Sequence, residues 1–246
     1  MDESAAEGVV VTPALGAHGA DARPSFKDSI QRFARHALDP LARGLAGLGL
    51  RPDHLTVIGL VLSVASGLAF ALGRFRTGAT FATLAGLCDI LDGQIARLIH
   101  RVSKFGAFLD STLDRLAEAA MLGGIAAFYM FNLVEQASDP ERVALNLSRG
   151  LAPYHWGIIS LLALLALAGS FMVSYTRARA EGLGVDCKVG WFERPERMIV
   201  LIIAGFIGLG PAMPGALLLL VVFSFATAFQ WMAHVWKQTR AAGRDA

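Results

Sequence analysis

The chain has 246 residues, of which 54% are hydrophobic and only 17% charged, and its mean hydropathy is +0.52. A soluble domain of this length carries about 25% charged residues, so the composition excludes an ordinary soluble protein and indicates a membrane protein. The net charge of +2 is too small to predict a nucleic-acid partner. The two cysteines, Cys88 and Cys187, lie far apart in sequence and show neither the spacing of a metal site nor a disulfide framework.

The N-terminal part is expected to contain a tail and one helix. Residues 1–24 mix Ala, Gly, Asp and Glu and lack the basic start and long apolar core of a signal peptide, so we predict a disordered tail. Residues 25–50 place apolar side chains at helical spacing and arginines elsewhere. Such a helix directly before a membrane span is typical of an amphipathic helix in the membrane interface. Pro40 is expected to kink or split it.

Six apolar stretches follow this helix. They occupy residues 54–73, 77–98, 106–133, 153–176, 196–210 and 212–236. Most reach the length of about 20 helical residues that is needed to cross the hydrocarbon core, and the fifth is shorter. The sequence therefore predicts an all-α integral membrane protein with six transmembrane helices, in a domain of residues 51–238 that is followed by a tail of residues 239–246.

The basic residues predict the orientation of this domain. If the N-terminus lies on the cytoplasmic side, only a few of the 22 Lys and Arg residues fall in outer loops, namely Arg74, Arg76, Arg142 and Arg149. Arg115 lies within a span. All the others lie in inner segments, which is the distribution of the positive-inside rule. We therefore expect both termini to face the cytoplasm.

Four aspartates lie inside the predicted spans, Asp89 and Asp92 in the second, Asp110 and Asp114 in the third. Inserting a charged residue into the membrane costs about 3 kcal/mol, so charged residues within spans usually have a function. Their spacings place each pair on one helix face, and the short loop 98–105 brings the pairs together in a hairpin. Four adjacent carboxylates cannot all stay ionised without cations. Two divalent cations would balance them, and all-oxygen ligands suit Mg²⁺ or Mn²⁺.

Small residues accompany the carboxylates. Gly93 and Gly106 have no Cβ, and Ala96 extends the small face, which leaves room for a flat base or a diphosphate. The complete motif reads Asp89-x-x-Asp92-Gly93-x-x-Ala96-Arg97, then eight residues, then Gly106-x-x-x-Asp110-x-x-x-Asp114. It resembles the signature of the CDP-alcohol phosphatidyltransferases, and the resemblance covers roughly residues 26–236.

The resemblance implies a reaction and its site. The reaction is transfer of a phosphatidyl-type group from a CDP-activated lipid to a hydroxyl acceptor with release of CMP. The two metal ions would be held by Asp89, Asp92, Asp110 and Asp114, and Asp114 would also be the general base. The CDP-lipid would contact Asp53 and Thr56, which begin the first span, and Gly93, Ala96 and Arg97. The resemblance also implies a homodimer in a bacterial or archaeal plasma membrane, with a cytoplasmic active site.

Two basic segments indicate the acceptor, residues 174–181 (SYTRARAE) and 193–197 (ERPER). Arginine is well suited to bind phosphate, and the interleaved glutamates indicate that some of the arginines are held in ion pairs. The segments resemble the phosphatidylinositol-phosphate and archaetidylinositol-phosphate synthase branch, which implies that Arg177 and Arg197 bind the phosphate of inositol 1-phosphate. Trp231 stands where that branch has a further arginine, so glycerol 3-phosphate or another phosphorylated polyol remains the alternative.

A cation or proton transporter is the alternative from another class, with the four aspartates as a relay. Transporters often contain internal repeats with broken helices in matching positions. No repeat is visible here, and all four aspartates fall in one hairpin. The sequence therefore favours the enzyme.

Overall fold

A computed structural model describes residues 38–99, 103–148, 152–185 and 192–242, and all regular elements in these ranges are helices. Residues 38–47 are helical. They are followed by α2 (Pro52–Ala71), α3 (Phe75–Leu98), α4 (Lys104–Ala137), α5 (Pro140–Ser148), α6 (Tyr154–Glu181), α7 (Arg194–Ile207) and α8 (Ala212–Ala242). The predicted all-α class is confirmed for these ranges. The predicted tail 1–24 and the first half of the helix predicted at 25–50 lie outside them.

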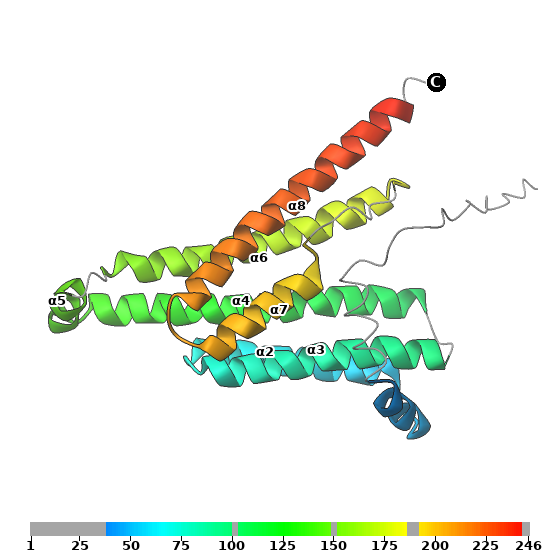
Figure 1. Cartoon of the computed structure of the whole chain (residues 1–246), viewed down its shortest axis with the longest axis horizontal. Coiled ribbons are helices and arrows are strands. Elements are labelled where there is room, and N and C mark those ends of the chain that lie inside the picture. The colour runs from blue at the N-terminus through cyan, green and yellow to red at the C-terminus, as the bar shows by residue number, and fades with distance from the viewer. Residues whose placement is uncertain (1–37, 100–102, 149–151, 186–191, 243–246) are drawn as a thin grey trace, which may run out of the picture. The chain divides into compact units, whose positions relative to one another are not determined.

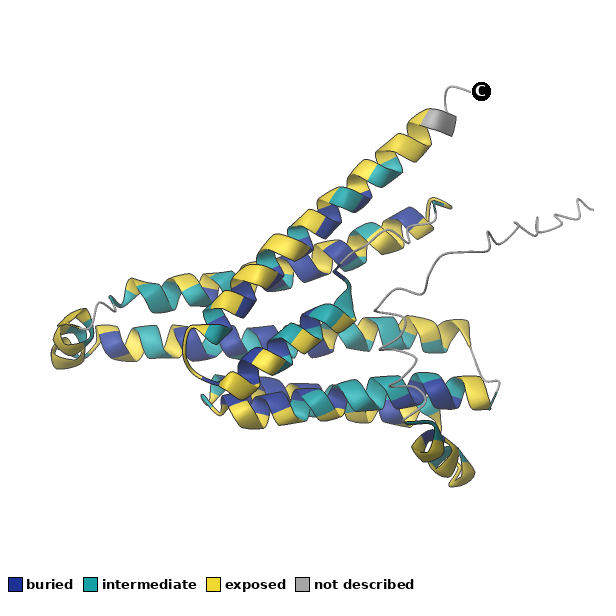
Figure 2. Ribbon diagram, viewed as in Figure 1, coloured by how far each residue is buried: buried dark blue, intermediate teal, exposed yellow. Residues whose placement is uncertain are grey.

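Within the described ranges, four helices are long and apolar enough to cross a membrane: α2, α4, α6 and α8. Helix α3 has 24 residues but includes four charged ones, and α7 has 14 residues, which span only about 21 Å. Large apolar side chains line the outer face of α2 at helical spacing, at Val57, Val61, Val64 and Leu68. Exposed residues likewise cover the outer faces of the other long helices (Figure 2). Apolar surface of this extent is typical of a protein that contacts lipid.

Helix α2 is central to one half of the packing. It lies against both α3 and α4, whereas α3 and α4 make few close backbone contacts with each other (Figure 1). Helix α6 packs against α4 and α8, and α7 packs against α3 and α8. Helices α3 and α4 are therefore held together largely through α2, and the side chains of their aspartates meet at one end.

An aromatic cluster lies where α2 ends and α3 begins. Phe75 contacts Phe128 edge to face with ring centroids 5.0 Å apart, and Tyr129 lies 5.2 Å from Phe128. Trp156, on α6, joins the same cluster at 5.7 Å from Tyr129. This aromatic cluster joins α3, α4 and α6 at one end of the bundle. The polar groups at the other end belong to helices that are packed together by this cluster.

Two glycines allow α2 and α4 to cross closely. A Cβ on Gly67 would overlap the carbonyl oxygen of Ala120, and a Cβ on Gly124 would overlap the carbonyl oxygen of Gly67. Because the obstacle is backbone in both cases, a side chain can be accommodated only if the helices separate.

We expect Gly124→Ala to destabilise the protein by about 1–3 kcal/mol, the usual range for overpacking. Gly123→Ala is the matched control, because a Cβ on the adjacent Gly123 would point into open space. This control should be neutral or slightly stabilising, since alanine favours a helix over glycine. Thermal unfolding of both variants in detergent measures the difference. Equal melting temperatures would show that the crossing tolerates a side chain.

Candidate active site

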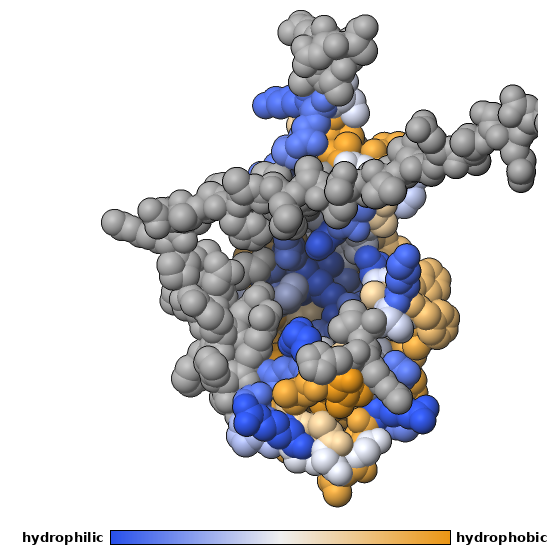
Figure 3. All heavy atoms as spheres, turned by 90° about the vertical axis from the view of Figure 1, so that its right-hand side faces the viewer, coloured by the Kyte–Doolittle hydropathy of each residue, from blue (hydrophilic) through white to orange (hydrophobic). Residues whose placement is uncertain are grey.

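The C-terminal ends of α3 and α6 and the N-terminal ends of α4 and α7 are all directed toward the same end of the bundle, on the right in Figure 1. Seen from that end, the surface is hollowed and strongly hydrophilic at its centre (Figure 3). This end contains the predicted site residues, whereas the aromatic cluster lies at the other end.

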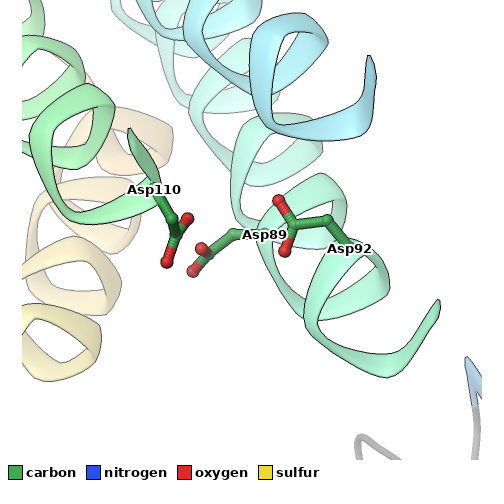
Figure 4. Close-up of side chains that lie close together, drawn as sticks. All are labelled: Asp89, Asp92 and Asp110. Atoms are coloured by element: carbon green, nitrogen blue, oxygen red, sulfur yellow. The ribbon is translucent and has the colours of Figure 1, made fainter. Parts of the chain in front are cut away.

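Three carboxylates meet between α3 and α4. Asp89 and Asp92 are one turn apart on α3 and face Asp110 on α4 (Figure 4). One oxygen of each lies within 4.8 Å of an oxygen of the other two. Oδ1 of Asp110 is buried and has no hydrogen-bond partner in the part of the chain that the structure describes. Carboxylate oxygens at this spacing fit a divalent cation such as Mg²⁺ or Mn²⁺.

Helix α2 orients one of these carboxylates. The Thr56 hydroxyl donates a hydrogen bond to Oδ2 of Asp92, at 2.9 Å. Asp92 is buried, so this contact fixes its side chain in one direction. Thr56 was expected near the CDP-lipid. The structure shows in addition that Thr56 contacts one of the three carboxylates, Asp92. Asp53 lies exposed in the first turn of the same helix.

The small face of α3 follows Asp92. A Cβ on Gly93 would lie 3.7 Å from Nη1 of Arg97, so the arginine side chain folds back over the glycine. Ala96 is half-buried beside it, and Arg97 is exposed. The three residues predicted to contact the CDP-lipid are therefore neighbours on the last two turns of α3.

Asp114 lies one turn beyond Asp110 and is not part of the group of three. Its Oδ1 is 2.7 Å from Nη2 of Arg194. Nη1 of the same guanidinium donates to Oδ2 of Asp89, at 3.1 Å. Arg194 therefore bridges the carboxylate group and Asp114, and it places a positive charge between two negative ones.

The start of α7 holds Arg194 in place. Glu193 caps the helix, and its side chain and that of Glu196 form a reciprocal capping box with the backbone. Residues three apart share a helix face, so Arg194 and Arg197 both point from the first turn of α7 toward the α4 side. The ERPER segment thus uses its glutamates for the helix terminus and its arginines for the site.

A cavity of about 360 Å³ lies next to Asp114. Its wall includes residues of α4, α6, α7 and α8, among them Glu118, Arg177, Arg194, Arg197 and Trp231. Arg177 and Arg197, the predicted acceptor-binding residues, are thereby brought together. The prediction that some arginines are held in ion pairs is confirmed, because Nε of Arg177 is 2.9 Å from Glu181 and Nε of Arg197 is 2.8 Å from Glu118.

Two participants were missed by the sequence analysis. Arg194 was noted only as one of several basic residues, and Glu118 was not singled out. A signal for Glu118 was present, because it continues the four-residue spacing of Asp110 and Asp114 along α4. Nothing in the sequence indicated which arginine each carboxylate would meet.

Comparisons with known proteins found one matching family and several similar proteins. Residues 50–236 match the CDP-alcohol phosphatidyltransferase family. The archaetidylinositol phosphate synthase of Methanothermobacter thermautotrophicus is 34% identical over 218 residues, which cover 87% of this chain and 94% of that protein. The phosphatidylinositol phosphate synthase of Mycobacterium marinum is 35% identical over 211 residues, 83% of this chain and 81% of that protein.

Solved structures of a third relative are also similar. The crystal structure of Mycobacterium tuberculosis phosphatidylinositol phosphate synthase with CDP-DAG bound aligns with a TM-score of 0.66 at 31% identity, over 83% of this chain and 94% of that one. The same enzyme in complex with manganese and citrate also aligns with a TM-score of 0.66, at 32% identity over 80% and 88% of the two chains.

Proposed function

The chain belongs to the CDP-alcohol phosphatidyltransferase family, and we propose that inositol 1-phosphate is the acceptor in its reaction. The enzyme transfers a phosphatidyl-type group from a CDP-activated lipid to a hydroxyl group and releases CMP. The observation that carries the proposed acceptor is the cavity next to Asp114, which has several arginines in its wall. Guanidinium groups bind phosphate oxygens in pairs, so this wall suits an acceptor that already bears a phosphate.

The group of Asp89, Asp92 and Asp110 fits the divalent metal that the enzyme uses, Mg²⁺ or Mn²⁺, and a solved relative contains manganese. We propose that two ions bind and that Asp114 completes the ligand set. Bound metal supplies polarisation of the phosphoryl oxygens and neutralises negative charge on the departing CMP.

Asp114 is proposed as the general base. Arg194 holds one of its oxygens, and the residue lies at the wall of the cavity that would contain the acceptor. The acceptor oxygen attacks the phosphorus atom of the phosphatidyl group while its proton passes to Asp114. A new P–O bond forms to the acceptor, and the P–O bond to CMP breaks, so the electron pair leaves with CMP.

The CDP-lipid is proposed to lie along the start of α2 and the end of α3. Asp53 and Thr56 come from the first helix, and Gly93, Ala96 and Arg97 from the second. The contact between Thr56 and Asp92 supports this placement, because it joins the two segments beside the carboxylate group. The small residues leave space there for the cytidine or the diphosphate.

We also propose six membrane crossings within residues 51–238, with α3 and the short α7 added to the four apolar helices. The distribution of basic residues supports an orientation with both termini and the aspartates at the cytoplasmic side. A homodimer in a bacterial or archaeal plasma membrane completes the proposal. Residues 38–47 support an interfacial helix, since Ala42 is buried while Leu41 is exposed.

The acceptor is tested by CMP release from CDP-diacylglycerol by the purified protein in detergent with Mg²⁺. Inositol 1-phosphate, free inositol, glycerol 3-phosphate and serine are supplied separately. We expect inositol 1-phosphate to give the highest kcat/KM, at least about tenfold above free inositol, because charge-assisted hydrogen bonds are worth about 1.5–3 kcal/mol. Release driven by glycerol 3-phosphate would reassign the acceptor, and release driven only by serine or free inositol would contradict a phosphorylated one.

A further inference from the structure

Glu118 and Arg197 form the most deeply buried ion pair among the described residues. Their side chains are 4% and 3% exposed, and they belong to α4 and α7. Oε1 of Glu118 accepts a hydrogen bond from Nε at 2.8 Å, and Oε2 accepts one from Nη2 at 3.1 Å. The carboxylate therefore binds one edge of the guanidinium through two parallel hydrogen bonds.

The two hydrogen bonds to Glu118 leave other N–H groups of Arg197 without a bond to that carboxylate. A guanidinium has five N–H groups, and Glu118 uses one on Nε and one on Nη2. Two on Nη1 and one on Nη2 remain, and one from each nitrogen forms the end of the planar group. Nη1 is buried and has no hydrogen-bond partner within the described ranges. Arg197 is one of the residues that line the cavity next to Asp114.

A second donor in the same wall is also without a partner. The indole Nε1 of Trp231 is buried and has no hydrogen-bond partner among the residues that the structure describes. The ring is 1% exposed and packs with Val173 and Ala228 on α6 and α8. Buried tryptophan N–H groups usually find an acceptor, so this one points to a ligand that supplies it.

Stability alone is a weak reason for the pair. Burying two charges requires their desolvation, and a buried ion pair often stabilises a protein no better than apolar residues of similar volume. A fixed guanidinium beside a cavity is instead useful for recognition, since the side chain no longer has to be ordered when the ligand binds.

We propose that Glu118 is a positioning residue that holds Arg197 by one edge, so that the end of the guanidinium binds the phosphate of the acceptor, with the Trp231 N–H as a further donor. The inference rests on the proposed function, because it requires a phosphorylated acceptor in this cavity. It deepens that function by assigning acceptor selectivity to two residues that do not belong to the aspartate motif.

The test is the kinetics of Glu118→Gln with CDP-diacylglycerol and inositol 1-phosphate. Glutamine has the same length but presents an NH₂ group to a guanidinium that can only donate, so Arg197 loses its alignment. We expect KM for inositol 1-phosphate to rise by about 10- to 100-fold. KM for CDP-diacylglycerol and kcat at saturating acceptor should change less than about threefold. Trp231→Phe should raise only the acceptor KM, by about three- to tenfold.

Glu135→Gln is the matched control. Glu135 lies on the same helix, about 25 Å further along its axis, and pairs with Arg142 at an exposed position. This variant should show wild-type kinetics. Equal KM increases for both substrates in Glu118→Gln, or a lower melting temperature with unchanged KM values, would overturn the positioning role.

Glu118→Asp keeps the charge and provides the second variant if Glu118→Gln does not fold. Its carboxylate is one methylene short, so KM for the acceptor should still rise, and an unchanged KM would again overturn the proposal. The acceptors tested with the wild-type enzyme distinguish a failure of the proposed function from a failure of the role of Glu118. A wild-type enzyme that uses only unphosphorylated acceptors contradicts both, whereas a phosphorylated acceptor with an unaltered KM in both variants contradicts only the role of Glu118.

Discussion

Removal of divalent metal with EDTA, or the substitution Asp110→Asn, is expected to lower CMP release by at least about 10³-fold. The metal stabilises charge in the transition state by several kcal/mol, and each 1.36 kcal/mol corresponds to a factor of ten. Asparagine keeps the size of the side chain and removes one of the three charges that draw a cation to the group. CMP release before and after addition of Mg²⁺ or Mn²⁺ measures the effect, which should be reversible for the wild type only.

The protein should stay folded under both treatments. Asp92 accepts a hydrogen bond from Thr56, and Asp89 accepts one from Arg194, so two of the three carboxylates have partners within the fold. Asp110→Asn also removes repulsion among the carboxylates. Its melting temperature without metal should therefore equal or exceed that of the wild type, while Mn²⁺ binding measured by calorimetry becomes weaker.

Asp139→Asn is the control for this pair of measurements, because Asp139 is exposed and pairs with Arg142 far from the group. It should bind Mn²⁺ and release CMP as the wild type does. Turnover by thoroughly chelated enzyme would refute the metal-dependent reaction, and unfolding on chelation would show that the metal holds the fold together.

Local spacing explains why much of the site could be predicted. Asp89 and Asp92 share a face of α3 because three residues make nearly one turn, and a short connection must bring α4 back beside them. The sequence therefore indicated both the carboxylate group and its metal. It did not indicate that α2 would pack against both α3 and α4, since the crossing of α2 and α4 depends on their close approach at Gly67 and Gly124.

Contacts between distant segments could not be predicted from spacing. Arg197 meets Glu118 although 79 residues separate them, and Arg194 meets Asp89 across 105 residues. Which arginine faces which carboxylate depends on the rotation of α7 about its axis, which the capping box and the packing on α3 and α8 determine together. Helix α5 was missed for a different reason, because its polar residues resemble a loop.

The structure also changes how Asp114 is understood. The motif treats the four aspartates alike, but the fold gives Asp114 a guanidinium partner and a place at the cavity wall. The other three face one another. This difference in surroundings supports the second role proposed for Asp114, toward the acceptor, and it predicts that substitutions of Asp114 and of the other three aspartates will differ in effect.

Asp114→Asn is expected to lower kcat by about 10²–10⁴-fold, the usual contribution of a general base. Binding of CDP-diacylglycerol should change less than about threefold, because the proposed CDP-lipid residues lie on α2 and α3 and Arg194 keeps its contact with Asp89. Asparagine retains an oxygen that can accept from Arg194, so the start of α7 should stay in place. Single-turnover CMP release and equilibrium binding of CDP-diacylglycerol measure the two quantities separately.

Asp110→Asn provides the informative comparison for this variant, because it should weaken Mn²⁺ binding as well as turnover. If Asp114→Asn weakened Mn²⁺ binding as much as Asp110→Asn does and lost CDP-lipid affinity with it, Asp114 would act only as a metal ligand and the proton would need another acceptor. If Asp114→Asn kept full activity, another residue would be the base, and the other carboxylates of the cavity wall are Glu118, Glu181 and Glu193. Glu118 is already held by Arg197 through both oxygens, which makes it a poor proton acceptor and favours Asp114.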